Sequence, residues 1–121
     1  MDNTYNNCVK ITAAVCGDRV ISLRNTYRNC HNITIPVCGL NVQDMSYTFY
    51  NCIKLTDNPV CGPNVTNMAY AYTNCTNLSL YPVCGKNVIN FTGTYSNCYN
   101  IKKAPVCGPS VETMVSTYLN C

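Results

Sequence analysis

Cysteine is the side chain with the most chemistry to offer in this sequence, since a thiol can form disulfides, bind soft metal ions or act as a nucleophile. The chain has 11 cysteines in 121 residues, a density that is typical of disulfide scaffolds in short secreted proteins. All of them fall into two series. One series follows asparagine and comprises Cys8, Cys30, Cys52, Cys75, Cys98 and Cys121; the other precedes glycine and comprises Cys16, Cys38, Cys61, Cys84 and Cys107. Cysteine is therefore a property of a repeating unit and not of one special site.

The cysteine spacing leaves two main alternatives for the state of the thiols. Metal binding is not expected, because there is no C-x-x-C pair and His31 is the only histidine. His31 stands beside Cys30 without an acid in register, so we predict no catalytic residue, no cofactor and no enzymatic activity. Free, buried thiols are favoured, since Val-Cys resembles the end of a core strand. Disulfides within each unit, between cysteines 8 or 9 residues apart, remain the alternative, with bridges between coils as a third.

Other side chains repeat in phase with the cysteines, at steps of 22 or 23 residues. An aromatic residue stands three positions before each Asn-Cys cysteine, and apolar residues recur at fixed positions on both sides. The aromatic positions are Tyr5, Tyr27, Phe49, Tyr72, Tyr95 and Tyr118. The other apolar positions include Ile33, Leu55, Leu78 and Ile101, then Val42, Val65 and Val88, then Met45, Met68 and Phe91. Most apolar residues thus belong to a few columns, which we expect to form the core.

A unit of this length cannot enclose its own apolar face, so neighbouring units must cover it. The sequence therefore predicts one repeat array over residues 1–121, with a partial unit at 1–8 and units at 9–30, 31–52, 53–75, 76–98 and 99–121. We expect an α/β solenoid of about five coils. Because the consensus runs from the first to the last unit, capping repeats are predicted to be missing.

Each unit divides into two halves with different patterns. Residues 33–37 are β-branched and predict a short parallel strand, which Pro36 and its equivalents Pro59, Pro82 and Pro105 should close. The glycine after each Val-Cys predicts a turn with positive φ. Val65, Met68, Tyr72 and Cys75 are spaced 3, 4 and 3 apart, which favours a short α-helix or 3₁₀ turns.

Some columns are expected to form structural ladders rather than binding sites. Stacked asparagine amides can hydrogen-bond along the axis and satisfy turn backbone. The ladder residues that we predict are Tyr27, Phe49, Tyr72, Tyr95, Asn29, Asn51, Asn74, Asn97, Cys30, Cys52, Cys75 and Cys98. A column of threonines, interrupted by Ala71, could indicate an ice-binding face, but such a face normally needs two parallel ranks.

Tyrosines outside the core columns are the candidate contact residues. A tyrosine ring packs while its hydroxyl bonds, which suits contact with a protein or glycan surface. The candidates are Tyr47, Tyr50, Tyr70, Tyr81 and Tyr99. The net charge of +3 is modest and Lys and Arg are scattered, so nucleic acid is not an expected partner. No apolar run is long enough for a membrane span.

The columns resemble the BspA-like leucine-rich repeats of bacterial surface proteins over the whole chain. The resemblance is carried by Val42/Met45/Phe49/Cys52/Leu55, Val65/Met68/Tyr72/Cys75/Leu78 and Val88/Phe91/Tyr95/Cys98/Ile101, and less fully by Val20/Leu23/Tyr27/Cys30/Ile33. It implies a right-handed α/β solenoid, located outside the cell, on the cell surface or on a virion. The strand positions are less leucine-rich than in that family, and Val-Cys-Gly is not part of its usual pattern.

The resemblance implies a non-enzymatic extracellular recognition or adhesion module. The alternative is a structural stalk or a subunit whose copies stack head to tail into a filament, because a terminal coil without a cap would expose apolar columns.

Overall fold

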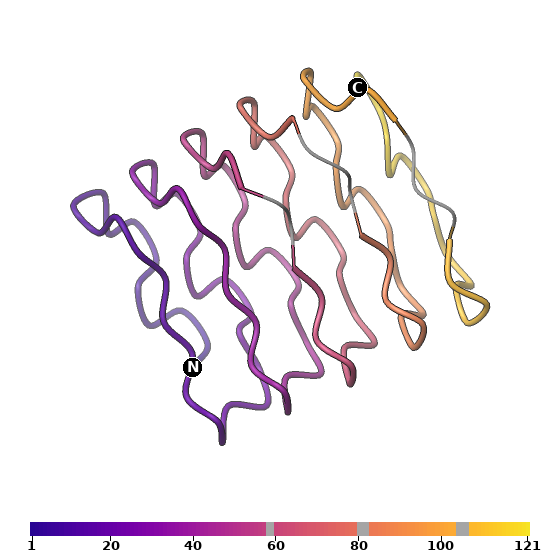
Figure 1. Cartoon of the computed structure of the whole chain (residues 1–121), viewed down its shortest axis with the longest axis horizontal. Coiled ribbons are helices and arrows are strands. Elements are labelled where there is room, and N and C mark those ends of the chain that lie inside the picture. Colours follow the sequence, from indigo (N-terminus) through magenta and orange to yellow (C-terminus); the bar gives the residue numbers. More distant parts are fainter. Residues whose placement is uncertain (58–59, 80–82, 104–106) are drawn as a thin grey trace.

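The computed structural model describes residues 1–57, 60–79, 83–103 and 107–121. The chain winds into coils that lie side by side, with the two termini at opposite ends of the stack (Figure 1). The predicted repeat solenoid is therefore present. The content of each coil differs from our expectation, since the described residues contain no helix and only isolated, single-residue β-bridges.

The apolar columns form the core. Val42, Met45, Phe49, Cys52 and Leu55 of one middle coil have no exposed surface. Their equivalents in the coils on either side are buried in the same way, and the half-buried residues of the first and last coils pack against them. Each coil thus contributes one layer to a continuous core, as the repeat predicts.

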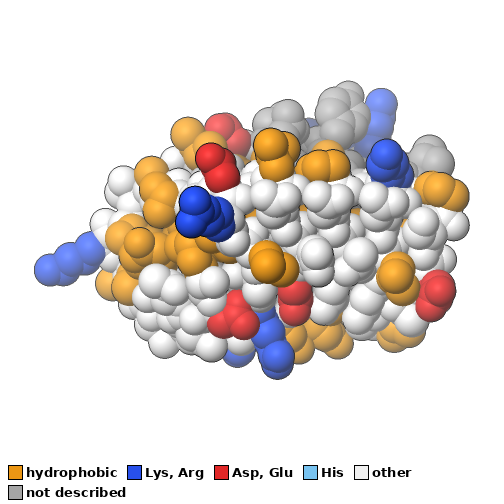
Figure 2. Space-filling model, turned by 90° about the horizontal axis from the view of Figure 1, so that it is seen from below, with side chains coloured by type: hydrophobic (Ala, Val, Ile, Leu, Met, Phe, Trp, Pro, Cys, Tyr) orange, Lys and Arg blue, Asp and Glu red, His pale blue; other side chains and the backbone are white. Residues whose placement is uncertain are grey.

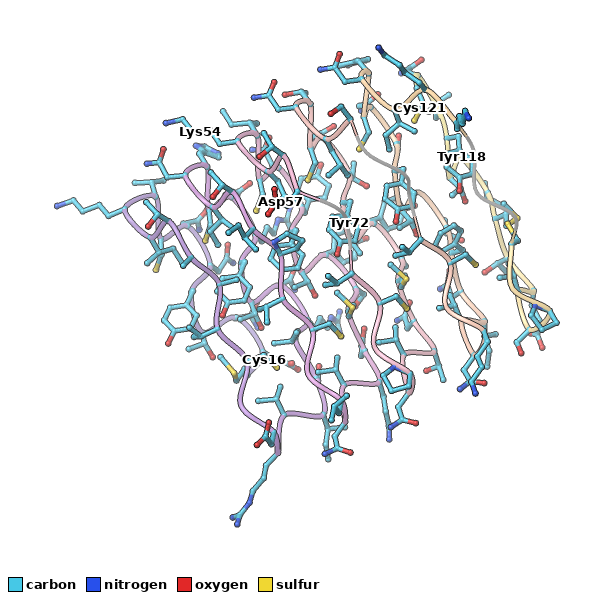
Figure 3. The ribbon with its side chains drawn as sticks, in the orientation of Figure 1. Cys16, Lys54, Asp57, Tyr72, Tyr118 and Cys121 are labelled. Carbon is cyan, nitrogen blue, oxygen red and sulfur yellow. The ribbon has the colours of Figure 1, made fainter. Side chains whose placement is uncertain are left out.

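The aromatic column is a continuous stack of six rings. Neighbouring rings have centroids 5.4 to 5.9 Å apart and planes within 7 to 14° of each other. Figure 3 shows Tyr72 within this stack. Such parallel, offset contacts between large apolar rings hold successive coils in one register.

The buried tyrosine hydroxyls of this stack are hydrogen-bonded. The Tyr72 hydroxyl donates to the Val60 carbonyl at 3.0 Å and accepts from the Val60 amide at 2.9 Å. Tyr95 makes the same pair of bonds with Val83, both at 3.1 Å, and Tyr27 makes them with Val15. Since a buried hydroxyl needs a partner, these bonds explain how tyrosine is tolerated in a core column that also accepts Phe49.

The half of each coil that we predicted as helical is a run of β-turns. The Thr26 amide donates to the Leu23 carbonyl at 2.9 Å, and the Cys30 amide donates to the Tyr27 carbonyl at 3.1 Å. Asn25 and Asn29, the third residues of these turns, have φ of 53° and 60°. A positive φ at this position is the mark of a type II turn and cannot continue a right-handed helix.

The amides between these turn bonds reach the next coil instead. Asn25 donates to the Ser46 carbonyl at 3.1 Å, Tyr27 to Thr48 at 3.0 Å and Asn29 to Tyr50 at 2.8 Å. The same alternation recurs in the later coils. The helical prediction is therefore not confirmed, because a spacing of 3, 4 and 3 also describes inward-facing residues of consecutive β-turns.

Parallel bridges occur at two places in the coil. One ladder joins every coil and runs Ser22–Asp44–Asn67–Asn90–Thr113. The predicted strand at 33–37 is reduced to a single bridge, between Ala13 and Ile35. Pro36 follows that bridge directly and lacks an amide donor, which accounts for its short length. The equivalent prolines Pro59, Pro82 and Pro105 lie outside the described residues.

The glycine of Val-Cys-Gly is needed for space and not for positive φ, so our prediction for it was wrong. A Cβ on Gly62 would lie 2.9 Å from the Gly39 carbonyl oxygen and 3.0 Å from the Cys38 Sγ of the preceding coil. A Cβ on Gly85 would lie 2.5 Å from the Cys61 Sγ. The cysteine of one coil thus packs against the glycine of the next, which links these two repeated positions.

The threonine column is buried, which removes the ice-binding alternative for it. Thr48 and Thr94 have no exposed surface, and Thr117 is 2% exposed. The Thr48 Oγ1 lies 2.7 Å from the Met45 carbonyl of its own coil and 3.0 Å from the Leu23 carbonyl of the preceding coil. Thr94 repeats this arrangement. The hydroxyls therefore satisfy main-chain carbonyls inside the turns.

The asparagine before each cysteine has two structural roles. Its residues all adopt positive φ, between 59° and 62°, which asparagine tolerates better than other residues with a side chain. Its side chains also form a surface ladder, in which the Asn29 amide donates to Asn7 at 2.8 Å and the Asn51 amide to Asn29 at 3.1 Å. Asn97 and Asn120 continue the ladder.

The role of glycine gives a first testable prediction. We expect Gly62→Ala to destabilise the protein by about 1–3 kcal/mol, because a new Cβ has no room. Gly17→Ala is the matched control, since the nearest atom to its Cβ would be a Val20 methyl at 3.9 Å. Thermal denaturation of both variants checks this, and equal melting temperatures would contradict the packing role.

Candidate functional site

The candidate contact residues Tyr47 and Tyr70 occupy equivalent positions in successive coils. Both are the third residue of the first β-turn, and their φ values are 56° and 57°. The same position holds Asn3, Asn25, Gly93 and Ser116 in the other coils, also with positive φ. A bulky residue rarely adopts this conformation, because its Cβ approaches the following carbonyl, at a cost of roughly 1–2 kcal/mol. Two tyrosines are therefore held in a strained backbone conformation that asparagine or glycine would fill more easily.

These tyrosines form a surface cluster with two further residues. The Tyr47 and Tyr70 rings stack with centroids 4.9 Å apart and planes 17° apart. Tyr50 packs against Tyr47 at 5.9 Å with a tilt of 43°. The Arg28 guanidinium carbon lies 4.8 Å from the Tyr50 ring centroid and 5.6 Å from that of Tyr47, within the range of a cation–π contact. We call Arg28, Tyr47, Tyr50 and Tyr70 the tyrosine patch.

The patch is partly exposed, and its ring faces are largely used in internal contacts. All four side chains are half-buried. Tyr47 lies between Tyr70 and Arg28. The Tyr70 ring also lies over Gly93, where a Cβ would approach Tyr70 Cδ1 and Cε1 to 2.5 Å. What the patch offers to a partner is therefore ring edges, phenolic hydroxyls and the guanidinium.

The polar groups of the patch have no partner among the described residues. The structure gives no hydrogen bond or ion pair between a described residue and the Arg28 guanidinium or the hydroxyls of Tyr47, Tyr50 and Tyr70. The buried tyrosines of the core stack differ in this respect, since Tyr72 and Tyr95 bond to backbone. The patch thus holds one cation and three phenols that are available for intermolecular contact.

The other candidate tyrosines are not part of this cluster. Tyr99 is 60% exposed and makes no ring contact with a described residue. Tyr81 lies outside the described residues. Arg28 was missed by the sequence reasoning, although a signal was present: it stands 22 residues before Tyr50 in the same column, so stacking of coils places them together.

The cysteines are free thiols in this structure. In the Asn-Cys series, each thiol donates to the carbonyl of the aromatic residue in the preceding coil: Cys52 to Tyr27, Cys75 to Phe49 and Cys98 to Tyr72, all at 3.1 Å. Burial raises the pKa of Cys52 and of Cys98 to about 12. Protonated thiols at ladder positions stabilise the coil interface and are poor nucleophiles.

Metal and charge offer no second site in the described part of the chain. No three His, Cys, Asp or Glu side chains there are grouped as metal ligands. His31 contacts the Asn51 amide at 3.2 Å. Figure 2 shows Lys and Arg interleaved with Asp and Glu on the face in view, without a basic stripe. A search for long apolar helices finds none within the described ranges that could cross a bilayer.

Comparison with solved structures identifies the class of fold. A leucine-rich repeat protein of T. pallidum superposes with a TM-score of 0.71 at 19% sequence identity, over 84% of this chain and 48% of that one. A leucine-rich repeat protein from Bacteroides ovatus superposes with a TM-score of 0.58 at 16% identity, over 84% of this chain and 33% of that one. The chain therefore has the solenoid fold of leucine-rich repeat proteins, and spans about half and a third of the length of these two.

Sequence comparisons add no closer relationship. No protein-family profile matches the chain, and no curated protein matches it. At these levels of identity the similarity defines the fold, and function has to be argued from the surface of this chain.

The buried thiols predict a dependence of stability on alkaline pH. The pKa of Cys52 is raised from 9.0 to about 12 in the folded protein, so unfolding releases a proton more easily. Its contribution to stability is therefore complete below pH 9.0 and lost as the pH rises toward 12. We expect melting temperatures to fall less steeply above pH 9 in Cys52→Ala than in wild type, and identical slopes would contradict this.

The contact between Tyr70 and Gly93 predicts a coupled pair. Gly93→Ala should destabilise the protein by about 1–3 kcal/mol, because the new Cβ meets the Tyr70 ring. In a Tyr70→Asn background the ring is gone and only the penalty of positive φ remains, about 1 kcal/mol. Urea denaturation of the two single variants and the double variant measures the coupling, with Ser116→Ala as a control at the same column position. Additive effects would show that the ring does not occupy this space.

Proposed function

We propose that this chain is a non-enzymatic recognition module, displayed outside the cell, that binds a protein partner through the tyrosine patch. The observation that carries the proposal is the strained backbone of Tyr47 and Tyr70, with φ of 56° and 57°. Strain that the fold does not require is typical of functional positions. Asn25 and Gly93 occupy the same position in other coils, so neither aromatic side chain is needed to build the turn.

The composition of the patch supports a protein partner. Tyrosine and arginine are enriched among the residues that dominate protein–protein binding energy, because they combine a large apolar surface with directional hydrogen bonds. In the tyrosine patch the rings of Tyr47, Tyr50 and Tyr70 are fixed by contacts with one another and with Arg28. Side chains that are already ordered lose little entropy on binding.

The mode of use also favours a protein over a stacked sugar. The faces of the Tyr47 and Tyr70 rings are engaged with each other, with Arg28 and with the space above Gly93. A ligand that needs an open ring face therefore finds little room, whereas ring edges and hydroxyls suit a protein surface.

The extracellular setting is supported by the resemblance to BspA-like surface repeats, and an adhesive role is part of the same proposal. The fold shared with the T. pallidum and Bacteroides ovatus proteins is compatible with such a module. The alternative of a stalk or head-to-tail filament subunit stays a prediction, because the structure describes a single chain.

The proposal is tested by a binding screen with matched variants. The immobilised chain is screened against a panel of extracellular matrix and cell-surface proteins, and against a glycan array. We expect binding to a protein that falls at least about tenfold in the Tyr47→Asn/Tyr70→Asn double variant, which corresponds to about 1.4 kcal/mol. Asparagine tolerates positive φ, so this variant should keep its stability within about 1 kcal/mol of wild type.

Tyr99→Asn is the control, because Tyr99 is exposed and lies outside the tyrosine patch. It should bind like wild type. Binding that persists in the double variant, or binding to glycans alone, would contradict the proposal.

A further inference from the structure

We propose that the partner presents a carboxylate to Arg28, and therefore that the tyrosine patch recognises an acidic peptide segment of a protein. This inference rests on the proposed function and specifies the chemistry of the partner. It follows from the way in which Arg28 is held, from the free polar groups around it, and from the absence of other cations in its column.

The Arg28 guanidinium is held by aromatic contacts and lacks an anionic partner within the described residues. Its central carbon lies 4.8 Å from the Tyr50 ring centroid and 5.6 Å from that of Tyr47. The described residues give its N–H groups neither a hydrogen bond nor an ion pair. Stacking on aromatic rings leaves the N–H edges of a guanidinium free, and these edges match a carboxylate in a two-point hydrogen bond.

The phenols next to Arg28 extend the same recognition. The hydroxyls of Tyr47, Tyr50 and Tyr70 have no hydrogen-bond partner among the described residues, and each can donate to an oxygen of an acidic group. The half-buried rings around them also lower the exposure of Arg28 to water. A charged pair with less solvent around it is stronger than one that is fully exposed.

The charge pattern favours one acidic side chain rather than a polyanion. A sulfated or phosphorylated polymer binds best to several cations in a row. The column of Arg28 carries no second cation. Its other positions are Asn6, Tyr50, Thr73, Ser96 and Leu119. One cation surrounded by tyrosine edges matches an aspartate or glutamate that is flanked by apolar residues in an otherwise neutral peptide.

The test uses a phage-displayed library of random peptides, selected on the immobilised wild-type chain. We expect the selected peptides to share an aspartate or glutamate next to an apolar residue. A synthetic peptide of the selected sequence, labelled for fluorescence polarisation, then gives dissociation constants. Arg28→Gln should weaken binding at least tenfold, and Arg28→Lys should restore only part of it, because lysine keeps the charge and lacks the planar fork.

A matched control and a coupled change make the test specific. Arg19→Gln removes the same charge at an exposed position and should leave binding unchanged. Replacing the acidic residue of the peptide by its amide should weaken binding to wild type, and should add little further loss in Arg28→Gln, since both changes remove one contact. Thermal melts of the variants verify that they are folded.

The possible failures are distinguishable. Selected peptides that lose affinity in Tyr47→Asn/Tyr70→Asn and not in Arg28→Gln would overturn this inference and leave the proposed function in place. Peptides that are insensitive to all of these changes would overturn both. Selection without acidic residues, together with heparin binding that depends on Arg28, would overturn the acidic peptide in favour of a sulfated polysaccharide.

Discussion

Successive main-chain amides in the turn half of each coil alternate between a bond within the coil and a bond to the next coil. Thr26 and Cys30 close turns in their own coil, while Tyr27 and Asn29 donate to Thr48 and Tyr50. An interior backbone amide has to find a partner, and this alternation provides one without a helix or a wide sheet. It requires positive φ at fixed positions, and it forces each coil to lie in register on its neighbour.

The register explains why the sequence is a set of columns. When coils are held in step by main-chain bonds, equivalent side chains are neighbours along the axis, and a residue that packs well against its own copy can be used in every layer. Tyr27, Phe49 and Tyr72 stack as parallel rings, Cys52 donates to the carbonyl of Tyr27, and Asn51 donates to Asn29. Contacts between equal columns therefore replace the varied packing of a globular core.

This regularity made the solenoid and its interior columns predictable from the sequence, since only stacked coils can bury a period of 22 or 23 residues. The local backbone was less accessible. Inward-facing positions of tandem β-turns have the same spacing as a helix face, so Val65, Met68 and Tyr72 did not distinguish the two. The glycine of Val-Cys-Gly looked like a residue needed for positive φ, but its reason lies in the preceding coil, where the Cys38 Sγ fills the space beside Gly62.

The candidate site shows the same division. Tyr47, Tyr50 and Tyr70 stood out in the sequence because they lie outside the core columns. Arg28 did not stand out, because its importance depends on a cation–π contact with the next coil. The strain at Tyr47 and Tyr70 is also a property of the backbone, and it became visible only through their φ values. Residue type predicted the candidates, and coil geometry defined the cluster.

The bonds between coils also determine how the protein responds to mechanical force. Each inner coil is bonded to its two neighbours only, through rows such as those that join Tyr27 to Thr48 and Phe49 to Ala71. A pull on the two termini therefore acts first on a terminal coil, and its release exposes the next layer to the same load. Such a chain unwinds in equal steps, so it can lengthen under tension while the coils that carry Arg28, Tyr47 and Tyr70 stay folded in the middle of the stack.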